Sequence, residues 1–208
     1  MSEKEKVYSV KIILLGETGV GKTCLINVYL DENEFNPLEI TTVVSTQNFK
    51  SLELNNKKLN ISFWDTNGQE KFCSITKSFI KGSNIVIFAY DITNRASFLE
   101  LNYWMNISLE ELKNEVIFGV VGNKIDKFNE CQVEKEEGEK FSKKIGALFT
   151  ETSAKENAIG FGNFVKKLLE KLLSNSKIVQ NLEVTIKEKE NFIQLGEDDT
   201  DIKNKKCC

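Results

Sequence analysis

One short segment constrains the fold more than any other part of this 208-residue chain. Gly16-Glu-Thr-Gly-Val-Gly-Lys22-Thr23 matches the pattern GxxxxGK[ST] and directly follows the apolar run Val10 to Leu15. Between a buried strand and a helix this pattern binds phosphate, because its glycines let backbone N–H groups curl around the anion at a helix N-terminus. We expect Lys22 to reach the β- and γ-phosphates and the Thr23 hydroxyl to ligate Mg²⁺. The alternative is a glycine-rich turn that binds nothing.

The composition excludes several other kinds of site. The chain has no histidine, so histidine metal sites and Ser-His-Asp or Cys-His catalysis are ruled out. Its 28 basic and 31 acidic side chains lack the basic excess that nucleic acid as the main partner would require. The N-terminus does not resemble a signal peptide, and apolar runs such as Ile85 to Tyr90 are too short to cross a bilayer. We therefore expect a soluble intracellular protein, unless something else anchors it.

Predicted strands and helices alternate along most of the chain. Apolar and alternating runs predict a hairpin around Asn55-Asn56-Lys57, and apolar spacing predicts helices from near Asn94 and from Phe161 to Leu173. The order βα(ββ)αβαβαβα indicates an α/β fold with a mostly parallel six-stranded sheet, one antiparallel strand and helices on both faces. Ligands of such sheets bind at the carboxyl ends of the strands. The six strands are predicted at 10–15, 45–54, 59–65, 84–90, 115–121 and 148–150.

The chain divides into three predicted parts. Residues 1–6 form an N-terminal extension, residues 7–174 form the globular domain, and residues 175–208 have few apolar residues and many charges. The last part is expected to be a flexible tail, with a local helix allowed near 184–192. Five cysteines without a CxxC pair argue against a disulfide framework or a zinc site, and two of them, Cys207 and Cys208, end the chain.

A second motif, Asp65-Thr-Asn-Gly-Gln69-Glu, stands at the end of a predicted strand. A carboxylate at this place beside the phosphate loop could hold the Mg²⁺ shell through water. The Gly68 N–H could touch a γ-phosphate, and Gln69 could orient an attacking water. Taken alone, the pattern DxxG is an ordinary turn.

Two further motifs could recognise a purine base. In Asn123-Lys-Ile-Asp126, the Asp126 carboxylate could accept hydrogen bonds from the N1–H and 2-amino groups of guanine, which adenine cannot supply. Asn123 would meet the other edge of the purine, and the Lys124 stem would cover the ring. The segment Glu151-Thr-Ser153-Ala154-Lys155 would supply a backbone N–H to the 6-oxo group. Each motif is weak alone, but four of them follow predicted strands in this order.

With these motifs in place, the chain resembles a small Ras-like GTPase, a P-loop NTPase G domain, over residues 7–174. Within that superfamily it looks like a Rab. The supporting residues are Trp64 before Asp65, the segments Asp91-Ile-Thr-Asn-Arg-Ala-Ser-Phe98 and Ser78-Phe-Ile-Lys-Gly82, and the terminal Cys207-Cys208. The resemblance implies a GTP/GDP-regulated switch of vesicular membrane trafficking. It also implies slow intrinsic hydrolysis that an activating protein stimulates by supplying an arginine.

The resemblance assigns roles to individual residues. Gln69 is the catalytic residue, Phe35 packs over guanine, and Thr42 binds Mg²⁺ when the γ-phosphate is present. The expected metal ligands are Thr23, Thr42 and Asp65, and the expected effector-facing residues are Gln47, Phe49, Trp64 and Phe79. The expected nucleotide contacts are Thr18, Gly19, Val20, Gly21, Lys22, Thr23, Cys24, Phe35, Thr42, Gly68, Asn123, Lys124, Asp126, Ser153, Ala154 and Lys155.

Partners follow from the same resemblance. They are guanine nucleotide, an exchange factor, a GTPase-activating protein, a GDP-dissociation inhibitor, effectors, and a membrane bound through geranylgeranyl chains on Cys207 and Cys208. The motifs look most similar to the endocytic branch of Rabs, which suggests the cytoplasmic face of an intracellular membrane such as the early endosome.

Asn67 departs from the family pattern, which has alanine at this place beside the metal. Its extra volume and polarity could slow hydrolysis, so a GTP-locked binding module is the alternative function. Thr18, Val44 and Gln47 also differ from common family residues. A P-loop ATPase or nucleotide kinase is disfavoured, because an adenosine enzyme has no need of the motif Asn123-Lys-Ile-Asp126.

Overall fold

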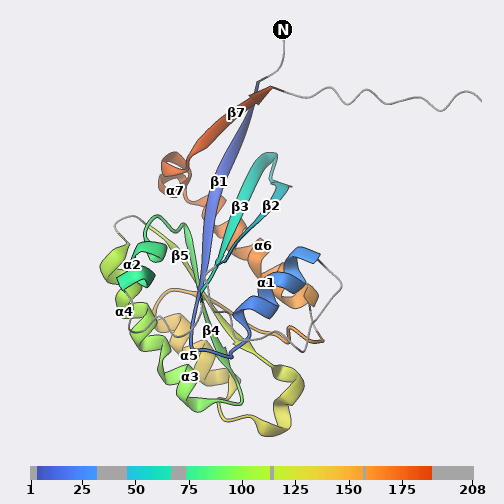
Figure 1. Cartoon of the computed structure of the whole chain (residues 1–208), viewed down its shortest axis with the longest axis vertical. Coiled ribbons are helices and arrows are strands. Elements are labelled where there is room, and N and C mark those ends of the chain that lie inside the picture. The colour runs from blue at the N-terminus through green and yellow to red at the C-terminus, as the bar shows by residue number, and fades with distance from the viewer. Residues whose placement is uncertain (1–3, 32–45, 67–73, 113–114, 157, 189–208) are drawn as a thin grey trace, which may run out of the picture.

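The computed structural model describes residues 4–31, 46–66, 74–112, 115–156 and 158–188, and all structural statements below concern these residues. Its centre is a seven-stranded sheet with helices on both faces (Figure 1). The strands are β1 (Lys4–Leu15), β2 (Thr46–Leu54), β3 (Lys57–Asp65), β4 (Ile85–Asp91), β5 (Ile117–Asn123), β6 (Leu148–Glu151) and β7 (Val184–Glu188). The helices are α1 (Lys22–Asp31), α2 (Ser74–Ile80), α3 (Arg95–Leu99), α4 (Leu101–Glu111), the 3₁₀ helix η2 (Ile125–Glu130), α5 (Lys135–Lys144), α6 (Ala158–Ser174) and α7 (Ser176–Asn181).

The sheet is mostly parallel, as the alternation of elements predicts. Its order is β2-β3-β1-β4-β5-β6, and β7 pairs with β1. Strands β3, β1, β4, β5 and β6 run parallel, whereas β2 is antiparallel to β3 and β7 is antiparallel to β1. The α/β class is therefore confirmed, but the expected six strands with one antiparallel strand are corrected to seven with two.

The carboxyl-terminal part of β1, Ile12–Leu15, is buried on both faces, and its successive side chains enter two separate cores. Ile12 and Leu14 pack with α1, α6 and α7, whereas Ile13 and Leu15 pack with α2, α3, α4 and α5. This alternation follows from the two-residue period of a strand, and it explains why β1 is a continuous apolar run. The sheet is thereby covered on both sides, and only its edges are available to loops that bind ligands.

Local sequence signals set the ends and faces of two helices. The Asn94 side chain accepts hydrogen bonds from the backbone N–H groups of Ala96 (3.0 Å) and Ser97 (3.3 Å), which makes it the N-cap of α3, where the sequence predicts a helix to open. The one helix predicted from there is divided into α3 and α4. The predicted apolar face of α6 is buried from Phe161 through Leu172, with Leu173 partly buried. Both helices were therefore predictable from the sequence.

Residues 176–188 differ from the flexible tail that their composition predicts. Helix α7 buries Ile178 against the α6 side of the sheet, Leu182 is buried beside it, and β7 then pairs with the first residues of β1. The sequence allows a helix near 184–192, but residues 184–188 form a strand instead. Their β-branched side chains favour a strand, and their backbone pairs with Lys4–Tyr8 at the start of β1. Residues 4–6 of the predicted N-terminal extension likewise belong to β1. The rest of the predicted tail, 189–208, lies outside the described residues.

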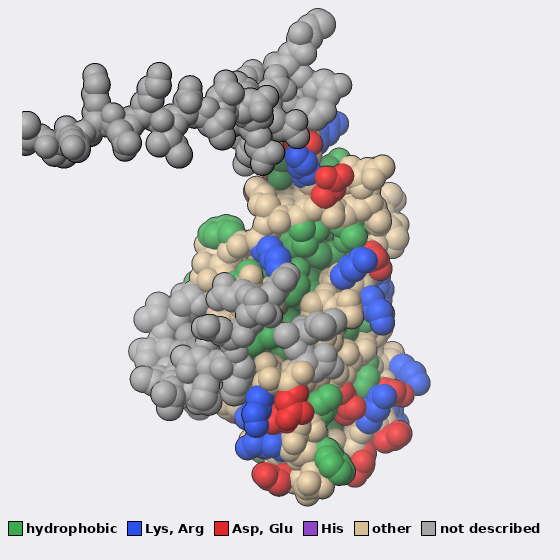
Figure 2. All heavy atoms as spheres, turned by 90° about the vertical axis from the view of Figure 1, so that its right-hand side faces the viewer, with side chains coloured by type: hydrophobic (Ala, Val, Ile, Leu, Met, Phe, Trp, Pro, Cys, Tyr) green, Lys and Arg blue, Asp and Glu red, His purple; other side chains and the backbone are tan. Residues whose placement is uncertain are grey.

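One face of the described part is mixed in charge. On the face shown in Figure 2, the coloured Lys and Arg side chains lie among Asp and Glu side chains rather than in a patch of one sign. Within the ranges that the structure describes, no helix is long and apolar enough to cross a membrane.

The buried position of Ile178 gives a test of the ordered segment after α6. We expect Ile178→Ala to lower the free energy of unfolding by about 2–4 kcal/mol, because it leaves a cavity in the core. Ile186→Ala is the matched control: this side chain is 62% exposed, and its loss should cost less than about 0.5 kcal/mol. Urea denaturation of the full chain measures both. Equal effects of the two changes would contradict the packing of α7.

Candidate nucleotide-binding site

The four sequence motifs meet at one edge of the sheet. The loop Gly16–Thr23 follows β1, Asp65 ends β3, Asn123 ends β5, and Ser153 follows β6. Because these four strands are parallel, their carboxyl ends lie on the same side. The structure therefore brings together residues more than 100 positions apart in the sequence.

The phosphate loop needs glycine at the two positions where it lies closest to its neighbours, Gly16 and Gly21. Gly21 has φ +95°, and a Cβ there would lie 2.4 Å from Asn123 Nδ2. A Cβ on Gly16 would lie 2.1 Å from the Ala89 carbonyl oxygen. Side chains at these positions would push the loop away from β4 and from the Asn123 loop. The glycines thus keep the loop pressed against the rest of the site.

Lys22 is buried at the start of α1, with 5% of its surface exposed. Its ammonium donates hydrogen bonds to the carbonyl oxygens of Gly16 (3.0 Å) and Glu17 (3.1 Å). The side chain therefore folds back over the loop, so that an anion in the loop would meet both the ammonium and the N-terminus of α1.

Thr23 and Asp65 form a second polar pair beside the loop. The Thr23 hydroxyl donates a hydrogen bond of 2.5 Å to Oδ2 of Asp65, whose side chain is fully buried. The neighbouring Thr66 hydroxyl donates to the Leu14 carbonyl oxygen at 2.8 Å and holds the end of β3 against β1. A hydroxyl and a carboxylate side by side are oxygen ligands of the kind that Mg²⁺ takes in proteins.

The buried amide of Asn123 links two loops. Its Nδ2 donates to the Val20 carbonyl oxygen at 2.8 Å, and its Oδ1 accepts from the Ala154 backbone N–H at 3.1 Å. The phosphate loop is thereby joined to the loop after β6. The structure shows Asn123 as a link between loops, and its expected contact with the purine edge stays a prediction.

The next residue, Lys124, reaches back across the same edge. Its backbone is left-handed (φ +70°), and its ammonium donates to the Gly19 carbonyl oxygen at 2.6 Å. It also forms an ion pair of 2.8 Å with Asp91 Oδ2. The sequence motifs give no role to Asp91, although a carboxylate at the end of β4 falls on the same edge as the motifs.

Asp126 is held by a buried serine. The Ser153 hydroxyl donates to Asp126 Oδ1 at 2.6 Å and accepts from the backbone N–H groups of Lys155 and Glu156, both at 3.1 Å. Ser153 is 1% exposed, so this arrangement has little freedom. Ser153 thereby fixes the orientation of the Asp126 carboxylate. The sequence did not show this role of Ser153.

Comparison with known proteins identifies this arrangement. Residues 11–178 match the model of the Ras family. The chain is 37% identical to the Ras-related protein Rab-18 of Lymnaea stagnalis over 174 residues, which cover 82% of this chain and 85% of that protein. It is 40% identical to human Rab-21 over 152 residues (73% and 67%) and 39% identical to human Rab-8B over 151 residues (73% and 72%).

The chain is a Rab-type member of the Ras family. Ras-family proteins of this type bind GTP and GDP and hydrolyse GTP, and the chain is therefore a GTPase. Among the Rab relatives, similarity to Rab-18 and Rab-21 fits the endocytic branch that the motifs suggest.

The predicted effector-facing residues of this Rab lie on or beside β2 and β3. Gln47 is opposite Trp64 in the strand register, and Phe49, on the same face of β2, is 70% exposed. The Trp64 and Phe79 rings are 5.5 Å apart, and the Lys11 ammonium lies 4.3 Å from the centre of the Trp64 ring. Burial lowers the pKa of Lys11. The structure thus brings Trp64 and Phe79 together, while their role toward effectors stays a prediction.

Several predicted residues fall in segments between or beyond the described ranges. Phe35, Thr42, Gly68 and Gln69 lie outside the described residues, as do Asn67 and the terminal Cys207 and Cys208. The remaining phosphate-loop residues Thr18 and Cys24 are partly buried beside Val20, which is buried.

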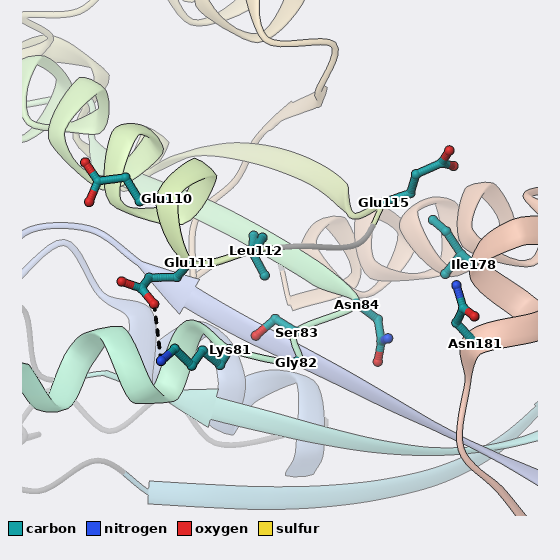
Figure 3. A pocket seen from close by; sticks show the side chains of 10 residues that line it. All are labelled: Lys81, Gly82, Ser83, Asn84, Glu110, Glu111, Leu112, Glu115, Ile178 and Asn181. Atoms are coloured by element: carbon teal, nitrogen blue, oxygen red, sulfur yellow. Dashed lines mark ion pairs between the residues drawn. The ribbon is translucent and has the colours of Figure 1, made fainter.

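A separate hollow of about 380 Å³ lies at the opposite end of the sheet (Figure 3). It is bounded by the segment before β4, the end of α4 and helix α7, and Lys81 and Glu111 form an ion pair of 3.5 Å at its rim. None of the predicted nucleotide or metal contacts lines it. This hollow therefore does not belong to the nucleotide site.

Asn123 gives a test of the link between the loops. We expect Asn123→Ala to lower the free energy of unfolding, at a fixed excess of GDP, by about 2–3 kcal/mol, because it leaves the Val20 carbonyl and the Ala154 N–H buried and unpaired. Asn102→Ala removes an exposed amide that bonds only within its own helical region, and it should cost less than about 0.5 kcal/mol. A loss for Asn123→Ala no larger than the control would show that the loops do not depend on this amide.

Proposed function

We propose that this Rab-family GTPase is a GTP/GDP-regulated switch of vesicular membrane trafficking. One observation carries the proposal: three features lie together at one edge of the sheet. They are the phosphate loop, the Thr23–Asp65 pair, and Asp126 held by the buried Ser153. The trafficking role is supported by the three relatives compared above, which are named as Rab proteins.

The phosphates would lie in the loop Gly16–Thr23. Backbone N–H groups of residues 18–24 would donate to the phosphate oxygens, and Lys22 would turn from its loop carbonyls toward the β- and γ-phosphates. Thr23, together with Thr42, would hold Mg²⁺, and Asp65 would hold it through water. The Thr23–Asp65 pair fits this role, because both groups are oxygen ligands and are already in contact. When bound, Mg²⁺ would neutralise charge that develops on the phosphate oxygens.

The base would be guanine. Asp126 would accept from its N1–H and 2-amino groups, with one carboxylate oxygen already fixed by Ser153. Lys124 would cover one face of the ring and Phe35 would pack against it, while Ala154 and Lys155 would complete the loop beside the 6-oxo group. Adenine offers no matching donors, so it would leave the Asp126 carboxylate unpaired, at a cost of about 10⁴-fold or more in selectivity.

Hydrolysis would proceed by in-line attack of a water oriented by Gln69, with the Gly68 N–H at the γ-phosphate. Arg95 is the only arginine of the chain. It is paired with Glu137 at 2.6 Å, where its hydrogen bond lowers the pKa of the Glu137 carboxyl. An arginine held there does not serve the phosphates, so intrinsic turnover would be slow and an activating protein would supply one in trans.

Single-turnover hydrolysis of GTP by the Mg²⁺-loaded full chain tests this mechanism. We expect slow hydrolysis in the wild type, largely lost in Gln69→Leu because no group orients the water, and little changed in Asn67→Ala. Unchanged hydrolysis in Gln69→Leu would overturn the role of Gln69. Hydrolysis that begins only in Asn67→Ala would favour the second candidate function, a GTP-locked binding module, which rests on asparagine replacing the usual alanine.

The switch would act on a membrane. Geranylgeranyl chains on Cys207 and Cys208 would attach it to the cytoplasmic face of an intracellular membrane, the early endosome by likeness to the endocytic branch. Its protein partners would be an exchange factor, a GTPase-activating protein, a GDP-dissociation inhibitor and effectors that contact Gln47, Phe49, Trp64 and Phe79.

Removal of the two terminal cysteines tests the anchor. We expect the shortened protein to move from the membrane fraction of cells to the soluble fraction, because two lipid chains supply most of the binding. Replacement of Lys203, Lys205 and Lys206 by Gln is the control and should leave most of the protein on membranes. Membrane association that survives loss of both cysteines would place the anchor elsewhere.

A further inference from the structure

Asp91 is a buried carboxylate at the nucleotide edge that the proposed mechanism does not use. It is the last residue of β4 and lies opposite Asn123 in the register with β5. Its backbone N–H donates to the buried Ser97 hydroxyl at 3.1 Å. Oδ1 accepts from the Thr93 backbone N–H (2.8 Å) and the Thr93 hydroxyl (2.7 Å), so that Oδ2 points in a fixed direction.

That direction is toward Lys124. The Lys124 ammonium lies 2.8 Å from Asp91 Oδ2 and 2.6 Å from the Gly19 carbonyl oxygen. The Asp91 side chain is only 10% exposed and that of Lys124 is 29% exposed. A lysine side chain has many rotamers and its charge favours water, so an ammonium held at two fixed acceptors confines the whole stem to one path.

The backbone of Lys124 also needs this support. It has φ +70°, a conformation that non-glycine residues seldom adopt and that the surrounding contacts must maintain. Asp91 on one side and the phosphate loop on the other supply contacts of this kind. The stem therefore bridges the loop after β5 to the phosphate loop along a path that these contacts set.

We propose that Asp91 is a positioning residue for nucleotide retention: it fixes the Lys124 stem where that stem covers the purine ring. The inference rests on the proposed guanine site, in which Lys124 covers the base. Among the described residues, the Asp91 carboxylate bonds to Thr93 and Lys124, whereas Asp126 bonds to Ser153. Its loss therefore weakens the hold on every purine that Lys124 covers and leaves the reading of the 2-amino group unchanged.

The test is the dissociation rate of a fluorescent GDP analogue from the Mg²⁺-loaded full chain, chased with excess GDP. Asp91→Asn keeps the shape of the side chain and removes its charge, and it should speed release by about tenfold or more. The acceleration should be the same for the inosine analogue, which lacks the 2-amino group. Glu137→Gln removes the charge of a carboxylate paired with Arg95, which is not among the predicted nucleotide contacts, and should change the rate by less than about twofold.

A double-mutant cycle with Lys124→Met separates positioning from a general structural effect. If Asp91 acts through Lys124, Asp91→Asn should add little once Lys124→Met is present. Additive acceleration of release in the double mutant would overturn the proposal. So would an unchanged release rate in Asp91→Asn when Lys124→Met releases the nucleotide faster than the wild type. No effect of Lys124→Met would instead show that the proposed base site itself is wrong.

Thr93→Val keeps the test decisive if Asp91→Asn does not fold. This variant removes one anchor of the carboxylate but keeps its charge, and it should speed release by a few-fold in the wild-type background. In the Lys124→Met background its effect should vanish. An acceleration that persists there would contradict the role of Asp91.

Discussion

The nucleotide edge of this molecule depends on one buried amide, that of Asn123. Each end of the amide makes a hydrogen bond to a different loop, to the Val20 carbonyl and to the Ala154 N–H. Such a group is stable in the interior only while both bonds are made, so it fixes the phosphate loop and the loop after β6 relative to each other. The same contact explains why Gly21 has no side chain, since a Cβ there would collide with Asn123. Phosphate binding and base recognition thereby become properties of one site.

The two ends of β1 serve different purposes. Its carboxyl end leads into the phosphate loop, whereas its amino end pairs with β7, so that Glu188 lies opposite Lys4 (Figure 1). Twelve residues of strand separate these ends, a distance of about 36 Å. Glu188, the last described residue, thus lies far from the nucleotide edge. This separation suits a switch whose proposed anchor and proposed nucleotide-sensing loops contact different partners.

Local patterns made much of the fold predictable. The apolar runs, the helix start near Asn94 and the spacing of apolar residues in α6 each depend on neighbours within a few positions, and each marks an element that the structure contains. Strand β7 was not predictable in this way, because its partner Lys4–Tyr8 lies some 180 positions earlier and its composition is that of a polar tail. The same limit applies within the site. The motifs name Asn123, Lys124 and Ser153, but their bonds to Val20, Asp91 and Asp126 depend on which strands are neighbours.

The central claim is that these loops form one guanine-specific site. It is tested most directly by displacing a fluorescent GDP analogue from the Mg²⁺-loaded full chain with GDP or with ADP. The account predicts that GDP displaces the analogue and that ADP needs a concentration about 10⁴-fold higher or more, since adenine offers no donors to the Asp126 carboxylate. Displacement by ADP at concentrations comparable to those of GDP would show that the loops hold phosphates without reading the base, and would contradict the account.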